Sequence, residues 1–328
     1  MSDELDVLAR ANPAPVDGPH LGDGPLDHRA ERRLELLLAT GRSPRTRSRA
    51  PRARLLWGLA ATGVVLATAL TVLLGGPNPQ PAVAAPRPLV VRADSTPVPL
   101  TLLADRAEAA GDGSARLRRG THVQSWSLGM SDHAPPITLP RETVVRWKPD
   151  GSHTELVVAT DPRHPGRPVL GDEGDHPRAV ADGHVISRQT YPPSWSDAPP
   201  AAPPPHDVAR LRAYLREAAS VHGGMNPGEL LDAVGILLDN WTLGARENAA
   251  LARLLAGTPG LRPVGQVTDR LGRTGQAYVH YDGLGARRML IMDPSTGAVL
   301  GLELTATRAD PEYGLKAGAV MQYAAWMR

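Results

Sequence analysis

The side chains of this chain that are best suited to chemistry are its eleven histidines and its carboxylates, because it has no cysteine. The lack of cysteine excludes thiol nucleophiles, disulfides and thiolate metal sites. The sequence has no Walker A phosphate loop, no HExxH or GxSxG motif, and no serine three residues before a lysine. No histidine and carboxylate stand at a recognisable catalytic spacing. We therefore predict a protein that is not an enzyme, with no catalytic residues and no cofactor; a hydrolase site assembled only in space stays open.

The densest group of possible metal ligands lies between Asp161 and Gly183. Its members are His164, Asp172, Glu173, Asp175 and His176. The group lacks the ordered oxygen spacing of a calcium loop, and its histidines have no fixed helical or strand spacing. We interpret it as a solvated loop and predict no metal site.

Large aromatic residues fall on segments with the alternation of β-strands. These residues are Trp126, Trp147, Tyr278, Tyr281, Tyr323 and Trp326. On a sheet covered by helices they would fill the core. The functional alternative is a groove for a lipid, a peptide or another apolar ligand, because a curved sheet closed by helices can enclose a cavity. The candidate groove residues are Trp126, Trp147 and Tyr278.

The elements that must position these residues begin with an apolar segment, Leu55–Leu74, which has no charged residue. At about 1.5 Å rise per residue, roughly 20 residues match the hydrocarbon core of a bilayer. We therefore predict a transmembrane helix over residues 55–76. The alternative is a secretory signal cleaved after Ala82–Ala84, but the apolar run is too long and begins too far from the N-terminus.

Arginines flank only one side of this segment, and no acidic residue lies among them. They are Arg42, Arg45, Arg47, Arg49, Arg52 and Arg54. Since Lys- and Arg-rich loops stay on the cytoplasmic side, this topology signal places residues 1–54 inside the cell and the C-terminal part outside. The predicted localisation is the plasma membrane, with the lipid bilayer as a partner. The formal charge of +2 reflects mainly these arginines, so we expect no nucleic-acid binding.

The cytoplasmic segment, residues 1–54, should form short helices, the clearer one over Leu26–Thr40. Such helices could either dock a partner or be structural filler. Residues 77–97 read as a Pro- and Ala-rich stalk with an extended piece at Leu89–Val91. An extracytoplasmic domain should follow over residues 98–328, with a Pro-rich connector at 192–205 and a helical insertion at 207–256.

Within that domain, period and capping residues predict each element. The expected helices are Leu100–Ala110, Asp207–Val221, Pro227–Asp239 and Ala245–Ala256. The expected strands are Thr121–Leu128, Glu142–Trp147, Thr154–Thr160, His184–Tyr191, Arg262–Asp269, Gly275–Tyr281, Ala286–Met292, Ala298–Thr305 and Gly318–Trp326. Tight turns between strands favour antiparallel pairing. The predicted fold class is α+β, a transmembrane helix followed by a curved antiparallel sheet packed with helices on one face.

Several segments together resemble an uncharacterised family of high-GC bacterial single-pass membrane proteins. They are MSDELDVLARANP, LLADRAEAA, a Trp followed by DGS, VGQVTDRLGRTGQAYVHYD and LIMDPSTGAVLG. Genes of this family often neighbour those of sigma factors, so the resemblance implies an anti-sigma-like regulator. Without cysteine, the zinc form of the anti-sigma domain is excluded. The domain also resembles curved-sheet lipoprotein-carrier and sigma-regulator domains at the level of fold.

These observations lead to one expectation and one alternative. We expect a non-enzymatic single-pass membrane protein whose outer domain binds an envelope ligand or partner and whose cytoplasmic segment regulates a sigma factor or another cytoplasmic regulator. The alternative is an envelope lipid or peptide carrier, or a scaffold, with a passive anchor.

Overall fold

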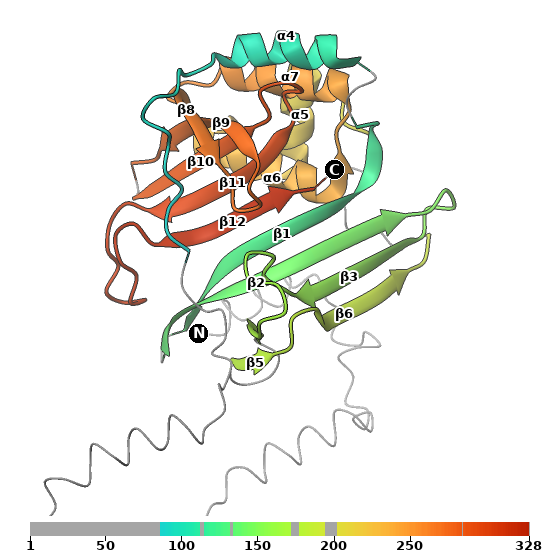
Figure 1. Cartoon of the computed structure of the whole chain (residues 1–328). Helices are drawn as coiled ribbons and strands as arrows, with labels where there is room; N and C mark the ends of the chain where they lie inside the picture. Colours follow the sequence, from blue (N-terminus) through green and yellow to red (C-terminus); the bar gives the residue numbers. More distant parts are fainter. Residues whose placement is uncertain are drawn as a thin grey trace, which may run out of the picture. The chain divides into compact units, whose positions relative to one another are not determined.

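A single antiparallel sheet dominates the computed structural model, which describes residues 86–327 apart from gaps at 112–114, 132–133, 172–176, 194–201 and 284. The strand order is β6-β3-β2-β1-β12-β11-β10-β9-β8, with β7 paired to β1 (Figure 1). Its strands are β1 (Arg118–Ser131), β2 (Ala134–Trp147), β3 (His153–Ala159), β6 (His184–Tyr191), β7 (Trp241–Thr242), β8 (Arg262–Thr268), β9 (Thr274–Tyr281), β10 (Ala286–Met292), β11 (Val299–Ala306) and β12 (Val320–Trp326). A separate hairpin joins β4 (Val169–Gly171) to β5 (Arg178–Val180).

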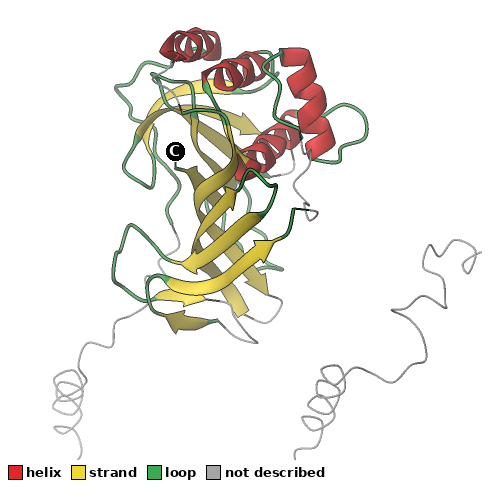
Figure 2. Cartoon of the chain, turned by 90° about the vertical axis from the view of Figure 1, so that its right-hand side faces the viewer, coloured by secondary structure: helices red, strands yellow, loops and turns green. Residues whose placement is uncertain are grey.

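Four helices accompany the sheet in the described part of the chain. They are α4 (Leu100–Ala110), α5 (Val208–Ala218), α6 (Pro227–Asn240) and α7 (Ala245–Ala256). Figure 2 shows them gathered over one end of the sheet, so that β2, β3 and β6 extend beyond them. The chain therefore covers only part of the sheet with helices.

Side-chain alternation divides the sheet into two faces with separate cores. Val123, Ala324 and Trp326 pack with the helices, and we call this side the helix-covered face. Their strand neighbours Trp126 and Tyr323 pack in a second cluster on the opposite side. Because successive side chains of a strand point to opposite faces, the register of each strand decides which core a residue joins.

The segment after residue 86 lies against this second cluster. Leu89 and Val91 pack on it, and Val91 forms an antiparallel bridge with Val267 of β8. The Ser95 hydroxyl accepts a hydrogen bond of 2.8 Å from the backbone N–H of Gln266. The extended piece predicted at Leu89–Val91 is thus part of the folded domain and not of a free stalk.

Glu303 ties this segment to the sheet from a fully buried position. Its carboxylate accepts hydrogen bonds from Arg270 at 2.5 Å, from Arg287 at 3.0 Å and from the backbone N–H of Leu89 at 3.1 Å. The side chains of both arginines are themselves largely buried. Buried charged groups are tolerated when they are paired and hydrogen-bonded. The local fold therefore depends on all members of this cluster being in place.

Most predicted elements have the expected type. Helices Leu100–Ala110 and Ala245–Ala256 and strands His184–Tyr191 and Ala286–Met292 have the predicted bounds. The region between Asp161 and Gly183, predicted as a loop, contains the β4–β5 hairpin instead.

The predicted fold class is wrong for the described residues. Strands hold 40% of them and helices 22%, so one large sheet dominates. One physical reason is that β1 and β2 are each 14 residues long, and their pairing runs well beyond the alternating segments. Pairing with a long partner strand extended β2 through Pro136 and Pro140, which locally disfavour strands.

The expectation of a membrane-spanning, single-pass chain has no support in the described structure, in which none of the helices combines the length and apolarity needed to cross a bilayer. The predicted helix Leu55–Leu74, the arginine topology signal from Arg42 to Arg54 and the cytoplasmic helices lie outside the described residues. The localisation that rests on them stays a prediction.

Candidate functional site

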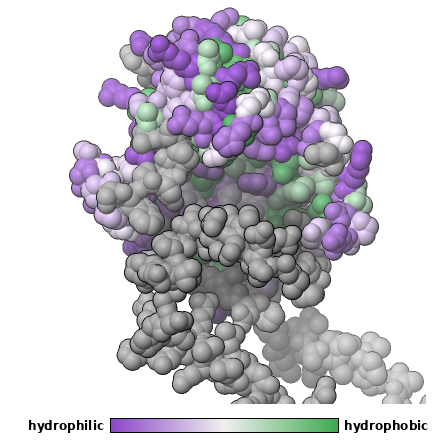
Figure 3. All heavy atoms as spheres, turned by 180° about the vertical axis from the view of Figure 1, so that it is seen from behind, coloured by the Kyte–Doolittle hydropathy of each residue, from purple (hydrophilic) through white to green (hydrophobic). Residues whose placement is uncertain are grey.

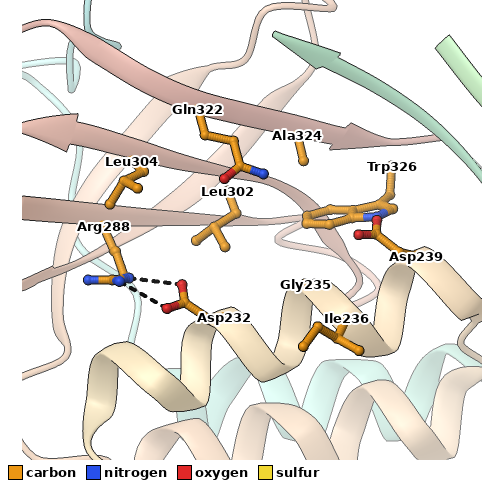
Figure 4. Close-up of a pocket in the computed structure, with 10 residues that line it drawn as sticks. All are labelled: Asp232, Gly235, Ile236, Asp239, Arg288, Leu302, Leu304, Gln322, Ala324 and Trp326. Atoms are coloured by element: carbon orange, nitrogen blue, oxygen red, sulfur yellow. Dashed lines mark hydrogen bonds and ion pairs between the residues drawn. The ribbon is translucent and has the colours of Figure 1, made fainter. Parts of the chain in front are cut away.

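A cavity of about 200 Å³ lies between α6 and strands β10 to β12 on the helix-covered face (Figure 4). Its lining residues are Asp232, Gly235, Ile236, Asp239, Arg288, Leu302, Leu304, Gln322, Ala324 and Trp326. Aliphatic side chains form its middle and charged groups stand at its two ends. Such a combination of apolar walls and few polar groups is typical of small-ligand sites.

Helix α6 forms one wall because its sequence gives it two distinct faces. Asn226 and Glu229 form a capping box at its start, and Pro227 occupies the first turn, where its missing N–H costs nothing. Leu231 and Val234 are fully buried in the core. The opposite side carries the pocket residues at positions i, i+3, i+4 and i+7, which share one face of a helix.

Arg288 stands at one end of the pocket, and carboxylates neutralise its charge. Its guanidinium donates to both oxygens of Asp232 at 3.0 and 2.9 Å, and to Asp282 at 2.9 Å. Burial alone would lower the pKa of Arg288, but the hydrogen bonds and charges of Asp232 and Asp282 outweigh it and raise that pKa. The charged groups at this end of the pocket are therefore one guanidinium cation and two carboxylate anions.

Asp239 stands at the other end, beside Trp326. The indole Nε1–H of Trp326 donates a hydrogen bond of 2.9 Å to its Oδ1 atom. The side chain of Asp239 is in contact with solvent, but the protein atoms that line the pocket surround much of it. This desolvation raises the pKa of Asp239 to about 6, although the hydrogen bond from Trp326 opposes the rise.

The raised pKa of Asp239 makes a prediction about stability. The folded state holds this proton to about pH 6, whereas the unfolded chain releases it near pH 3.8, so the contribution of Asp239 to stability falls as the pH rises between these values. Asp239→Asn should flatten this part of the stability profile, as measured by the melting temperature from pH 4 to pH 7. The control Asp105→Asn removes a carboxylate at an exposed position of α4. A profile of Asp239→Asn that matches that of the natural chain would contradict the assignment.

The helix-covered face continues from the pocket across β1 onto β2 and β3. Ala324 pairs with Ser125 of β1, Ser125 with Arg141 of β2, and Arg141 with Ala159 of β3, so these side chains share a face. Seen from behind in Figure 3, the molecule is hollowed below the helices, and hydrophobic side chains are visible in the hollow. The pocket therefore lies on a face of the sheet that continues onto β2 and β3.

A stack of flat side chains crosses the far part of this surface. The guanidinium of Arg119 lies 3.4 Å from the ring centroid of Trp147. Trp147 stacks on His153 at 4.0 Å, and His153 stacks on Tyr191 at 4.5 Å between ring centroids. These contacts link strands β1, β2, β3 and β6 across the sheet.

The three residues predicted to line a groove lie in three separate places. Trp126 is buried in the second cluster, against Tyr323 with 5.5 Å between ring centroids. Tyr278 is fully buried under the helices, where its hydroxyl donates a hydrogen bond of 2.8 Å to the carbonyl of Val98. Trp147 belongs to the stack described above. The structure therefore does not bring them together.

The predicted solvated loop gives no metal site among its described residues. Its His164 lies 3.3 Å from Asp161, whose carboxylate also binds Arg163. Across the described part of the chain, no group of three or more His, Asp or Glu residues could hold a metal ion. Asp172, Glu173, Asp175 and His176 lie outside the described residues.

The pocket residues Asp232, Asp239 and Arg288 were missed by the sequence reasoning. One signal was available, because Asp232 and Asp239 are seven residues apart and so lie on the same face of the predicted helix. Arg288, on a strand distant in the sequence, carried no signal that linked it to that helix. The pocket itself could not be located from local patterns.

Comparisons with known proteins place this chain in no family. No family model matches it, and no curated protein matches it. Among solved structures, an inactive mutant of the CurK dehydratase shares 12% identity, with 72% of this chain and 82% of that chain covered, at a TM-score of 0.10. The dehydratase domain from the CurK module of the curacin polyketide synthase shares 10% identity over the same shares of the chains, also at a TM-score of 0.10. These similarities are too low to indicate a fold or a function.

Proposed function

We propose that the described domain is a non-enzymatic binding module whose pocket between α6 and the sheet takes the apolar tail or side chain of a ligand. The observation that carries this proposal is the pocket itself, in which Ile236, Leu302 and Leu304 present aliphatic groups to a cavity open to solvent. At about 200 Å³ the cavity suits one short chain and not a whole lipid.

The arrangement of polar groups supports binding better than catalysis. Asp239 has a raised pKa, as many general acids and bases do. Its hydrogen-bond partner, however, is the indole of Trp326, and the other carboxylate lining the pocket, Asp232, is engaged by Arg288. A nucleophile with its base, which covalent catalysis requires, is not among the lining residues.

Gly235 provides a direct test, because it lines the pocket and a Cβ placed on it would meet no atom within 4 Å. Gly235→Phe should fill the cavity and reduce the affinity for octyl glucoside, a neutral amphiphile, by about tenfold or more in isothermal titration of the full chain. Helix stability should not fall, since glycine is a poor helix former.

The matched control is Gly224→Phe, which places the same side chain at an exposed site where a Cβ also meets no atom within 4 Å. This variant should bind the probe as the natural chain does. If octyl glucoside does not bind the natural chain, or binds Gly235→Phe equally well, the proposal is wrong.

A second part of the proposal concerns the segment Met1–Arg54, which we expect to bind a sigma factor or another cytoplasmic regulator. Its support is the sequence resemblance to proteins encoded beside sigma factors. Deleting residues 1–40 should abolish the capture of a sigma factor by the full chain in a pull-down, while octyl glucoside binding is retained. If the segment captures no partner at all, the alternative of an envelope carrier or scaffold with a passive anchor is favoured.

A further inference from the structure

The charges around the pocket indicate the class of its ligand. Resting on the proposed function, we infer that the ligand carries a cationic ammonium group on an apolar body, with Asp239 as its counter-charge and the indole of Trp326 beside it. The aliphatic residues in the middle of the pocket would contact the apolar body. This inference depends on three features of the site.

The first feature is that Arg288, the only cation among the described residues that line the pocket, is already paired. Arg288 binds both oxygens of Asp232 and one oxygen of Asp282. A bidentate guanidinium–carboxylate pair is a strong and geometrically specific interaction. A ligand carboxylate, sulfate or phosphate would have to displace these carboxylates, so Arg288 does not favour an anionic ligand.

The second feature is the position of Asp239 in the last turn of α6, which ends at Asn240. The last carbonyl groups of a helix carry partial negative charge, and a cation is favoured there. The last turn of α6 contains no basic residue that could occupy this position. The carboxylate and the helix end therefore add two negative contributions at the same end of the pocket.

The third feature is the indole ring of Trp326, which lies next to Asp239 in the pocket wall (Figure 4). Its Nε1–H donates to Asp239, which fixes the orientation of the ring relative to the carboxylate. Tryptophan is the best aromatic partner for an ammonium group through cation–π attraction. A carboxylate and an indole side by side can therefore recognise a quaternary or protonated amine.

The pH dependence follows from the titration of Asp239, whose pKa is raised by desolvation. Other charged groups also lie at or beside the pocket. These are Asp232 from the same helix as Asp239, Arg288 from β10 and, through Arg288, Asp282 after β9; β11 and β12 contribute uncharged lining residues. Ionised Asp239 attracts an ammonium group and neutral Asp239 does not, so affinity should rise with pH through about 6. Asp239→Asn removes this titration and leaves Asp232 and Asp282 in place.

The test compares three probes with the same octyl tail below their micelle-forming concentrations: octyltrimethylammonium, octyl glucoside and octyl sulfate. In isothermal titration of the full chain at pH 7.5, the ammonium probe should bind about tenfold more tightly than the glucoside, the range of an added ion pair or cation–π contact. The sulfate should bind most weakly. In Asp239→Asn the ammonium and glucoside probes should bind with similar affinity at every pH.

The outcomes separate this inference from the proposed function. Equal binding of the three probes, with all of it lost in Gly235→Phe, would overturn the ammonium inference and leave the apolar pocket standing. A preference for ammonium that persists in Asp239→Asn would also overturn it. If no probe binds the natural chain, both proposals fail.

Discussion

Glu303→Gln should lower the free energy of unfolding by about 3–5 kcal/mol, the usual cost of removing one partner from a buried ion pair. Glu303 is fully buried, and its carboxylate is shared by Arg270, Arg287 and the backbone N–H of Leu89. A glutamine has nearly the same shape but leaves two largely buried guanidinium groups without their counter-charge. Urea unfolding of the variant and the natural chain, followed by circular dichroism, measures the difference.

A matched control is Glu312→Gln, because Glu312 is exposed near the turn before β12. Its effect should stay within about 0.5 kcal/mol, as for most surface substitutions. The segment from Leu89 to Ser95 should also exchange its amide hydrogens faster in Glu303→Gln. Similar stabilities of the two variants would show that the buried cluster does not hold the second face together.

The second large effect is expected at Leu231, which is fully buried on the core side of α6. Leu231→Ala should destabilise the domain by about 2–5 kcal/mol through lost burial and the cavity left behind. Since α6 also forms the pocket wall, the variant should bind octyl glucoside more weakly even under conditions in which the domain is still folded. Chemical unfolding and isothermal titration measure the two effects separately.

Leu102 of α4 supplies the comparison, because it is 41% exposed and carries the same side chain. Leu102→Ala should change stability and probe affinity little, since it removes few buried contacts. A loss of stability in Leu231→Ala as small as that in Leu102→Ala would contradict the packing of α6 described above.

Local patterns were sufficient to locate the helices of the described domain. For α6, the Asn226 cap, the Pro227 position and the leucine spacing all agree with one helix, and the structure begins it at Pro227 as predicted. Such agreement arises because caps and periodicity are set by residues within one or two turns. The strand that ends at Trp147 was predicted too short, because its length depends on a partner strand.

The pocket depends on contacts between residues that are distant in the sequence. Asp239 meets Trp326 across 87 positions, and Arg288 meets Asp232 across 56. The candidates Trp126 and Tyr278 were expected to share a groove, but register places them on opposite faces. A shift of one residue would reverse those faces, and no local pattern in the sequence fixes such a register.

The most direct test of the pocket is to find where an apolar probe binds. An octyl chain bearing a terminal diazirine can be crosslinked to the full chain by light, and the labelled residues identified by tandem mass spectrometry. The account predicts labels on Ile236, Leu302 and Leu304, and their loss in Gly235→Phe. Labels confined to other surfaces, or labelling that Gly235→Phe leaves unchanged, would contradict it.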